Sequence, residues 1–336
     1  MSELTLQDVI GKTAKPADNS MQILNVADYY SAGNYTSSLT KFQQDNNRRT
    51  GFNNLDNIQG LYSGFYVLGA ISSLGKTTFC HQMADQLAVN GETVLYFSLE
   101  QNYFELFSKS LSRHFYQRWL EDDSKPLFSS IEIRRGVPQQ NHLNYFEEQA
   151  QEYVNAVGEN LNIVECNFNA TVEDITKSVE GFMQKTGKKP VVMVDYLQII
   201  SPTLVNGYPG NSKTNIDHIV HSLKCFQSLH NLVVIVISSL NRQNYMTPMD
   251  FESFKESGGI EYTADVVWGL QLAVINDDIF AKEGRIKEKR EVIRKAKTSD
   301  PRLIQLVCLK NRYGISNYTV AFDYFPKYDV FVPYAE

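Results

Sequence analysis

Short apolar runs alternate with segments of helical periodicity along most of the chain. From Gly51 onward the pattern predicts strand, loop and helix in repeated order. The expected strands are Phe65–Leu68, Glu92–Leu99, Leu161–Cys166, Pro190–Asp195 and Leu232–Ser238, and the expected helices are Lys76–Val89, Tyr103–Leu120, Val172–Lys185 and Ile216–His230. Two of the strands, PVVMVD and LVVIVIS, are almost wholly apolar, as strands buried on both faces are. This alternation predicts an α/β fold, a mainly parallel twisted sheet with helices on both faces.

The two ends of the chain depart from this alternation. After Asp265 the pattern changes to strands at Val266–Val274, Leu303–Leu309 and Tyr318–Phe322, which we expect to extend the same sheet. Residues 1–48 are rich in Ser, Asn, Gln, Thr and Asp. We expect them to form an arm or linker with one or two short helices, the alternative being a disordered tail. Residues 49–336 are expected to form one domain.

Composition narrows the class of protein. With 336 residues and 43% hydrophobic residues, the chain can form one large domain or two modest ones. A net charge of −6 argues against a basic exterior for nucleic acid, although a local basic strip stays possible. Of four scattered cysteines, three lie in apolar strand- or helix-like contexts, which indicates buried thiols in a reducing compartment. The sequence shows neither a signal peptide nor an apolar run that could span a membrane, so we expect a cytoplasmic protein.

The segment AISSLGKT fits the pattern of a phosphate-binding loop, with Ala in the first Gly position. It follows an apolar strand and precedes a helix, so its backbone N–H groups would surround phosphates at the helix N-terminus. Lys76 would reach the β- and γ-phosphates of ATP, and the Thr77 hydroxyl would bind Mg²⁺. The residues expected to bind the nucleotide are Ala70, Ile71, Ser72, Ser73, Leu74, Gly75, Lys76, Thr77 and Thr78.

Two carboxylates complete this chemistry. Asp195 closes a buried strand and is the expected second Mg²⁺-linked residue. The next residue is Tyr196, which disfavours the ring ATPases whose catalytic Glu directly follows this Asp. Glu100 ends the strand after the P-loop helix, a position that we expect to lie beside the P-loop in a parallel sheet. We assign Glu100 as the base that orients and deprotonates water, which predicts a RecA-like P-loop NTPase core.

Five motifs follow one another along the chain: TGFNNLDNIQGLYSGFYVLGA (50–70), FSLEQ (97–101), VDYLQII (194–200), SSLNR (238–242) with KESGGIEYTADVV (255–267), and LKNRYG (309–314). With these motifs, in this order, the chain resembles the C-terminal motor domain of the DnaB family of replicative helicases. Together these motifs cover about Thr50 to Phe325, which is most of the chain.

The resemblance implies a six-subunit ring with ATP at each subunit interface. Lys310 and Arg312 match residues that reach into the neighbour's site and neutralise charge on the γ-phosphate. Gln198 would couple the nucleotide to the loop that follows it. Loops 201–214 and 243–259 would face a central channel and hold the backbone of single-stranded DNA. The residues that the resemblance places on DNA are Arg242, Lys255, Glu256 and Gly258.

Several positions depart from the family pattern. The family usually has Gln where this chain has Ser239, and an Asp-Leu-Arg sequence where it has Ser-Phe-Lys ending at Lys255. Lys keeps the charge but lacks the bidentate fork of Arg. Residues 282–302, with nine Lys or Arg against four Asp or Glu, are longer than the usual connection and are typical of a solvated helix. The family's N-terminal helical domain, which helps to assemble the ring and bind primase, has no counterpart in residues 1–48.

Three functions follow from these observations. The leading hypothesis is an ATP-dependent DNA helicase or translocase of DNA replication, active as a homo-hexameric ring with a replication partner or loader protein. The alternative is a RecA-like ATPase that binds DNA as a regulator or loader without unwinding. A catalytically silent relative would have to retain Lys76, Thr77, Glu100, Asp195 and Arg312 by accident.

Overall fold

The computed structural model describes residues 25–31, 33–45, 48–202, 212–241, 245–254, 257–282 and 284–334. The chain divides into two compact units, Met1–Asp45 and Asn46–Glu336. The described part of the first unit forms helices α2 (Val26–Ser31) and α3 (Asn34–Asp45). No helix in the described ranges combines the length and apolarity that crossing a bilayer requires.

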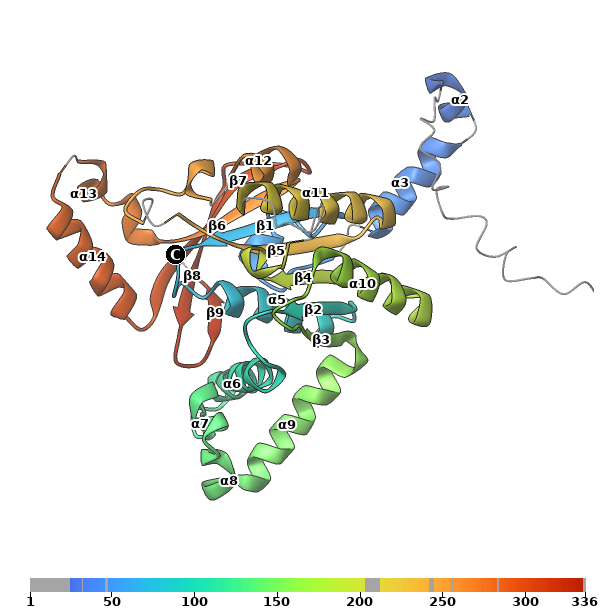
Figure 1. The fold of residues 1–336 in the computed structure, drawn as a ribbon. Helices are drawn as coiled ribbons and strands as arrows, with labels where there is room; N and C mark the ends of the chain where they lie inside the picture. The colour runs from blue at the N-terminus through green and yellow to red at the C-terminus, as the bar shows by residue number, and fades with distance from the viewer. Residues whose placement is uncertain are drawn as a thin grey trace, which may run out of the picture. The chain divides into compact units, whose positions relative to one another are not determined.

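The described residues of the second unit form a nine-stranded sheet in the order β3-β2-β4-β5-β1-β6-β7-β8-β9 (Figure 1). Its strands are β1 (Gly64–Ala70), β2 (Val94–Ser98), β3 (Leu161–Glu165), β4 (Val191–Asp195), β5 (Val233–Ser239), β6 (Val266–Leu272), β7 (Arg302–Asn311), β8 (Thr319–Phe325) and β9 (Val330–Pro333). In the spatial order, neighbouring strands from β3 through β2, β4, β5 and β1 to β6 pair in parallel. Strands β7, β8 and β9 each pair antiparallel with the strand before them. The predicted mainly parallel sheet, and its extension by the strands after Asp265, are confirmed.

Helices cover both faces of this sheet, as predicted. Figure 1 shows α11 and α12 on one side and α5, α6 and α9 on the other. The helices are α4 (Asn53–Asp56), α5 (Lys76–Val89), α6 (Tyr103–Glu121), α7 (Ser130–Arg134), α8 (Val137–Asn141), α9 (Leu143–Val157), α10 (Val172–Thr186), α11 (Ser212–His230), α12 (Ser257–Thr263), α13 (Asp278–Ala281) and α14 (Ile286–Thr298). Reciprocal capping boxes start α6, between Asn102 and Glu105, and α10, between Thr171 and Asp174.

The core lies on both sides of the central strands. Every residue of β1, β4 and β6 is buried, which explains why these strands are apolar without alternation. A side chain at Gly69 would collide with Phe254 and Leu240, so the close packing of β1 requires a glycine there. A smaller apolar cluster, around Phe115 and Tyr153, packs α6, α7 and α9 together outside the sheet. The sequence made no prediction for α7 to α9, or for β9.

Candidate functional site

The loop between β1 and α5 has the backbone of a phosphate-binding turn. Gly75, with φ of +86°, is the residue before α5, and Ser73 has φ of +70°. The left-handed region suits glycine, and a Cβ at Gly75 would lie 2.9 Å from both Phe331 and Tyr324. Because this sharp turn ends at Lys76, the free N–H groups of the first turn of α5 face the loop. Such a helix N-terminus attracts anions.

The P-loop borders a cavity of about 500 Å³, which is the size of a site for a small ligand. The residues that line it are Ser72, Ser73, Gly75, Lys76, Thr77, Thr78, Glu100, Gln101, Lys109, Tyr196, Ser239, Arg302 and Tyr324. Two predicted site residues that follow separate strands, Lys76 after β1 and Glu100 after β2, therefore share one cavity. Its cations and P-loop backbone suit a polyphosphate, and Glu100 adds a carboxylate.

Asp195 lies at the end of β4 with only 1% of its surface exposed. Its Oδ2 accepts a hydrogen bond of 3.0 Å from the Tyr96 hydroxyl, while its buried Oδ1 has no partner among the described residues. Burial raises the pKa of Asp195, and the Thr77 and Tyr96 hydroxyls and Lys76 offset part of this rise. A buried carboxylate oxygen without a partner is costly unless a ligand or a cation satisfies it.

The residues present fit a Mg²⁺ ion. Within the described ranges no group of three or more His, Cys, Asp or Glu residues could hold a metal alone. Mg²⁺ does not require such a group, because it binds to one or two protein oxygens together with phosphates and waters. The free Oδ1 of Asp195 and the Thr77 hydroxyl are the oxygens that would hold it.

Glu100 lies at this cavity beside the P-loop, although its strand does not neighbour the P-loop strand. Strand β2, which precedes Glu100, does not neighbour β1, because β4 and β5 lie between them. Glu100 still lines the cavity, because all these parallel strands end at one edge of the sheet and Ser98 pairs with Asp195. The Glu100 side chain is exposed, so water can reach it.

Gln198 connects the ends of two strands. Its Nε2 donates to the Ser238 Oγ at 2.8 Å, and its Oε1 accepts from the Ser239 backbone N–H at 3.0 Å. Ser239 lines the nucleotide cavity, whereas Gln198 does not. The side chain of Gln198 thus lies between the cavity edge at β5 and the segment after β4, where a coupling residue is expected.

Lys310 and Arg312 lie far from the P-loop of their own chain. Lys310 pairs with Val267, near the start of β6, whereas Arg302 at the other end of β7 donates to the Ser73 carbonyl at 2.9 Å. At 3.4 Å per residue, Arg302 and Lys310 are roughly 27 Å apart along the strand. The two predicted cations therefore lie at the opposite edge of the sheet from the cavity.

Hydrogen bonds hold these two cations in place. Arg312 Nη1 lies 3.1 Å from Oδ1 of the buried Asp265, whose Oδ2 lies 2.5 Å from Lys224 Nζ. Lys310 Nζ donates to the Glu261 carbonyl at 2.5 Å. Burial and the nearby Arg312 lower the pKa of Lys310. About half of the Arg312 side chain is exposed, so its guanidinium can also contact another molecule.

Two cations of the cavity were not predicted from the sequence. Lys109 comes from the second turn of α6, and Arg302 from the start of β7. The Arg302 Nε is buried without a partner among the described residues. No sequence signal marks Lys109, because helical periodicity alone does not distinguish a lysine that lines a site from one on a solvated face.

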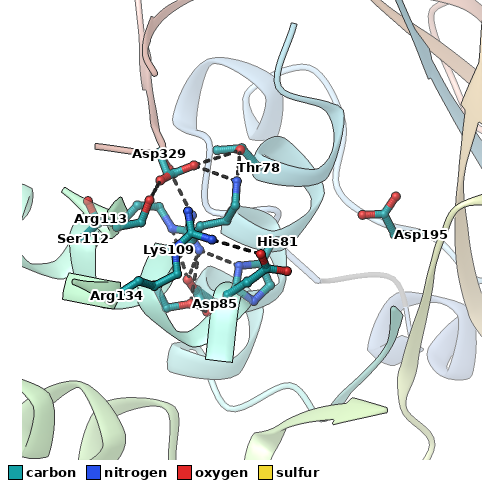
Figure 2. Close-up of polar contacts among 12 residues, drawn as sticks. Thr78, His81, Asp85, Lys109, Ser112, Arg113, Arg134, Asp195 and Asp329 are labelled. Atoms are coloured by element: carbon teal, nitrogen blue, oxygen red, sulfur yellow. Dashed lines mark hydrogen bonds and ion pairs between the residues drawn. The ribbon is translucent and has the colours of Figure 1, made fainter. Parts of the chain in front are cut away.

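An acidic residue of the β8–β9 turn holds Lys109 (Figure 2). Asp329 Oδ1 lies 2.7 Å from Lys109 Nζ, which also donates to the Thr78 hydroxyl at 3.2 Å. Asp329 Oδ2 accepts from the Ser130 hydroxyl at 2.6 Å. Only 16% of the Lys109 side chain and 7% of the Asp329 side chain are exposed, so water screens this pair weakly. Asp329 thereby connects α5, α6 and α7 beside the P-loop.

A second buried ion pair lies behind the first. Arg113 Nη2 is 2.6 Å from Asp85 Oδ2 and 2.8 Å from His81 Nδ1, and Arg113 Nη1 donates to the Asp329 carbonyl at 3.0 Å (Figure 2). Burial lowers the pKa of His81 to about 3, so its ring is neutral near pH 7. Burial raises the pKa of Asp85, but Arg113 and His81 more than offset this and lower it overall. These contacts fix the P-loop helix against α6.

The Asp329→Asn variant is expected to lower the free energy of unfolding by about 3 kcal/mol, because it leaves the ammonium of Lys109 without its counter-ion. Urea denaturation would measure the loss. Asp123→Asn, at an exposed turn, is the matched control and should change stability little. Equal stability of the Asp329→Asn variant and the original protein would contradict the structural role of this pair.

The residues predicted to contact DNA fall mostly outside the described part of the chain. Arg242, Lys255 and Glu256 lie there, as does most of loop 201–214. Gly258 is described and lies in the first turn of α12. A Cβ at Gly258 would meet no heavy atom within 4 Å. A ligand can therefore approach its backbone closely.

Comparison with known proteins agrees with this geometry. Residues 48–332 match the family described as the DnaB-like helicase C terminal domain. A solved structure described as an ATPase domain has a TM-score of 0.70 and 22% identity, over 93% of this chain and 100% of that chain. Another, "The Structure Of A DnaB-Like Replicative Helicase And Its Interactions With Primase", has a TM-score of 0.68 and 20% identity, over 98% of this chain and 71% of that chain. No curated protein sequence matches. The predicted resemblance and the RecA-like α/β fold are thereby confirmed.

Proposed function

This chain belongs to the DnaB-like helicase C-terminal domain family, and from that premise we propose that it is an ATP-driven helicase or translocase of DNA replication that moves on single-stranded DNA. Membership of this family supports the assignment as a replicative helicase-type ATPase. The observation that supports hydrolysis most directly is the shared cavity of the P-loop and Glu100, with the unpartnered oxygen of Asp195 nearby.

In this proposal each group of residues at the cavity has a distinct role in ATP hydrolysis. The P-loop backbone, of which Ser72, Ser73 and Gly75 to Thr78 line the cavity, and the ammonium of Lys76 bind and orient the phosphates of ATP. Ala70, Ile71 and Leu74 belong to the same loop but do not line the cavity. Thr77 and Asp195 hold Mg²⁺, which when bound neutralises charge on the β- and γ-phosphates. Glu100 orients the attacking water and accepts its proton. Gln198 links this cavity to the segment after β4 through Ser238 and Ser239.

We propose that the site is completed by a second copy of the chain in a closed ring, most simply a hexamer. Lys310 and Arg312 lie at the edge of the sheet opposite to their own P-loop, which supports a role in the neighbour's site. A head-to-tail interface of this kind places one end of a subunit against the other end of the next. The two cations would then neutralise charge on the transferred phosphoryl group.

The proposed DNA-contact segments follow two strands that end at the cavity edge of the sheet. Loop 201–214 follows β4, and Arg242 and loop 243–259 follow β5. Arg242, Lys255, Glu256 and the backbone of Gly258 would contact the DNA. Six copies of a few contacts can hold a strand without a basic exterior, which agrees with the net charge of −6. A loader or another replication protein would place the ring on DNA.

The proposal is tested by measuring ATP hydrolysis and strand separation in an assembled sample. Native mass measurement with ATP and a single-stranded oligonucleotide would establish assembly first. We expect a hexamer, ATP hydrolysis stimulated by the oligonucleotide, and unwinding of a forked duplex, with all activity lost in Lys76→Ala. A verified hexamer that shows neither stimulated hydrolysis nor unwinding would contradict the proposal.

A second function is favoured by one position. Ser239 lines the cavity where the family usually has Gln, and its short hydroxyl changes how the site contacts the γ-phosphate. This supports a RecA-like ATPase that acts as a DNA-binding regulator or loader without unwinding. Replication in cells that express only the Lys76→Ala variant separates the two functions. Survival of the biological function without hydrolysis would favour the regulator.

A further inference from the structure

Helix α14 concentrates positive charge on an otherwise acidic chain. Its 13 residues include six Lys or Arg and two Glu, a formal charge of +4. The whole chain has a charge of −6, so the residues outside α14 together carry −10, that is −6 minus +4. A cluster of positive charge on an acidic chain indicates a polyanionic ligand. The cluster is not needed for solubility, because the acidic residues of the rest of the chain already provide it.

The helix is fixed by one face and exposed on the other. Val292, Ile293 and Ala296 are half-buried against the core, while no residue of α14 is fully buried. Lys289 Nζ anchors the first turn by donating to the carbonyls of Phe280 at 3.2 Å and Lys282 at 2.7 Å. Figure 1 shows α14 on the outer side of the unit, beyond β6 to β8. Its charged face is therefore held in one orientation.

Three cations of the exposed face are available to a ligand. Lys287, Arg290 and Lys295 are exposed and form no ion pair with any described residue. Arg294 does pair with Glu291 at 2.7 Å, but both side chains are well exposed, so this pair contributes little. Lys287 and Arg290 are three residues apart, which places them side by side on the helix surface.

The position of α14 points to nucleic acid as the polyanion. Near its C-terminal end, Lys297 Nζ lies 5.7 Å from the centre of the Tyr245 ring. Tyr245 belongs to the segment after β5 that the proposed function places on DNA. A strand that leaves this segment can therefore continue along α14.

We propose that α14 is a second nucleic-acid contact, in which Lys287, Arg290 and Lys295 bind successive phosphates of the single-stranded DNA that passes the segment after β5. The proposal rests on the proposed function, because it takes the DNA path from it. It adds a specific binding surface that is separate from the loops and from the ATP site.

The test compares two triple variants of the full chain. The first is Lys287→Gln with Arg290→Gln and Lys295→Gln. The control is Lys177→Gln with Lys185→Gln and Lys188→Gln, which removes the same charge from exposed positions on and after α10. Anisotropy of a fluorescein-labelled oligothymidylate, with a non-hydrolysable ATP analogue, gives the affinity at a series of salt concentrations. Thermal melting verifies that all three proteins are folded.

Each phosphate contact on a single strand contributes about 0.7 to the slope of log K against log salt. The α14 variant should therefore lose about 2 from this slope, and bind tenfold to a hundredfold more weakly near 0.1 M salt, while the control keeps the original slope. An unchanged slope in the α14 variant, or an equal loss in the control, overturns the inference and leaves the proposed function standing. Absence of binding by the original protein would overturn both.

Discussion

The Glu100→Gln variant is expected to hydrolyse ATP about 10²–10⁴-fold more slowly than the original protein while it still binds ATP. Gln keeps the size and polarity of the side chain but cannot accept a proton from water. Glu100 lines the same cavity as Lys76 and is exposed to solvent, so the substitution should not disturb packing. Steady-state phosphate release measures hydrolysis, and a fluorescent ATP analogue measures binding.

Matched controls separate this effect from a general loss of acidic charge. Glu148→Gln, at an exposed position of α9, should leave hydrolysis unchanged. Lys76→Ala should weaken ATP binding as well as hydrolysis, because it removes a cation from the phosphate site. If Glu100→Gln hydrolyses ATP at the original rate, another group is the base and the assignment is wrong.

The central strands were predictable because burial on both faces leaves an unmistakable apolar run. Val191–Asp195 and Val233–Ser239 were located to within a residue, and helix Lys76–Val89 was predicted with its observed bounds. The capped, strongly periodic helix α10 was also predicted to within a residue. The local sequence pattern was sufficient to predict an element wherever that element has the same environment along its whole length.

The order of strands could not be read from local pattern. The sequence predicted that Glu100 lies beside the P-loop, but not that β4 and β5 separate its strand from β1. The prediction still brought Glu100 to the P-loop cavity, because parallel strands end at a common edge and the crevice there spans several strands. The proximity was therefore predicted correctly, whereas the order of the strands was not predicted.

Contacts between segments that are far apart in the sequence were the main features that the sequence did not predict. Lys109 and Asp329 are 220 positions apart, and no local signal connects a lysine in a helix to an aspartate in a hairpin turn. Helices α7 to α9 form their own small core with α6, and two of them span only five residues each. Helices that short have too few turns for their periodicity to be recognised.

The Arg312→Ala variant is expected to hydrolyse ATP about 10³-fold more slowly, as the loss of an arginine finger does. The fold should survive, because Asp265 keeps its contacts with Lys224 at 2.5 Å and with the Phe65 backbone N–H at 2.8 Å. Measured alone, this loss does not establish where Arg312 acts. The distance along β7 between its own P-loop and Arg312 supports action on a neighbouring subunit.

Mixing two inactive variants tests that placement. In a ring assembled from equal amounts of Arg312→Ala and Lys76→Ala chains, about a quarter of the interfaces join an intact P-loop to an intact Arg312. The mixture should therefore regain a measurable fraction of the original activity, whereas each variant alone stays inactive. Native mass measurement must show mixed hexamers in the same sample. Mixed hexamers that remain as inactive as either parent would contradict action across the interface, since Arg312 and Lys76 would then be required on the same chain.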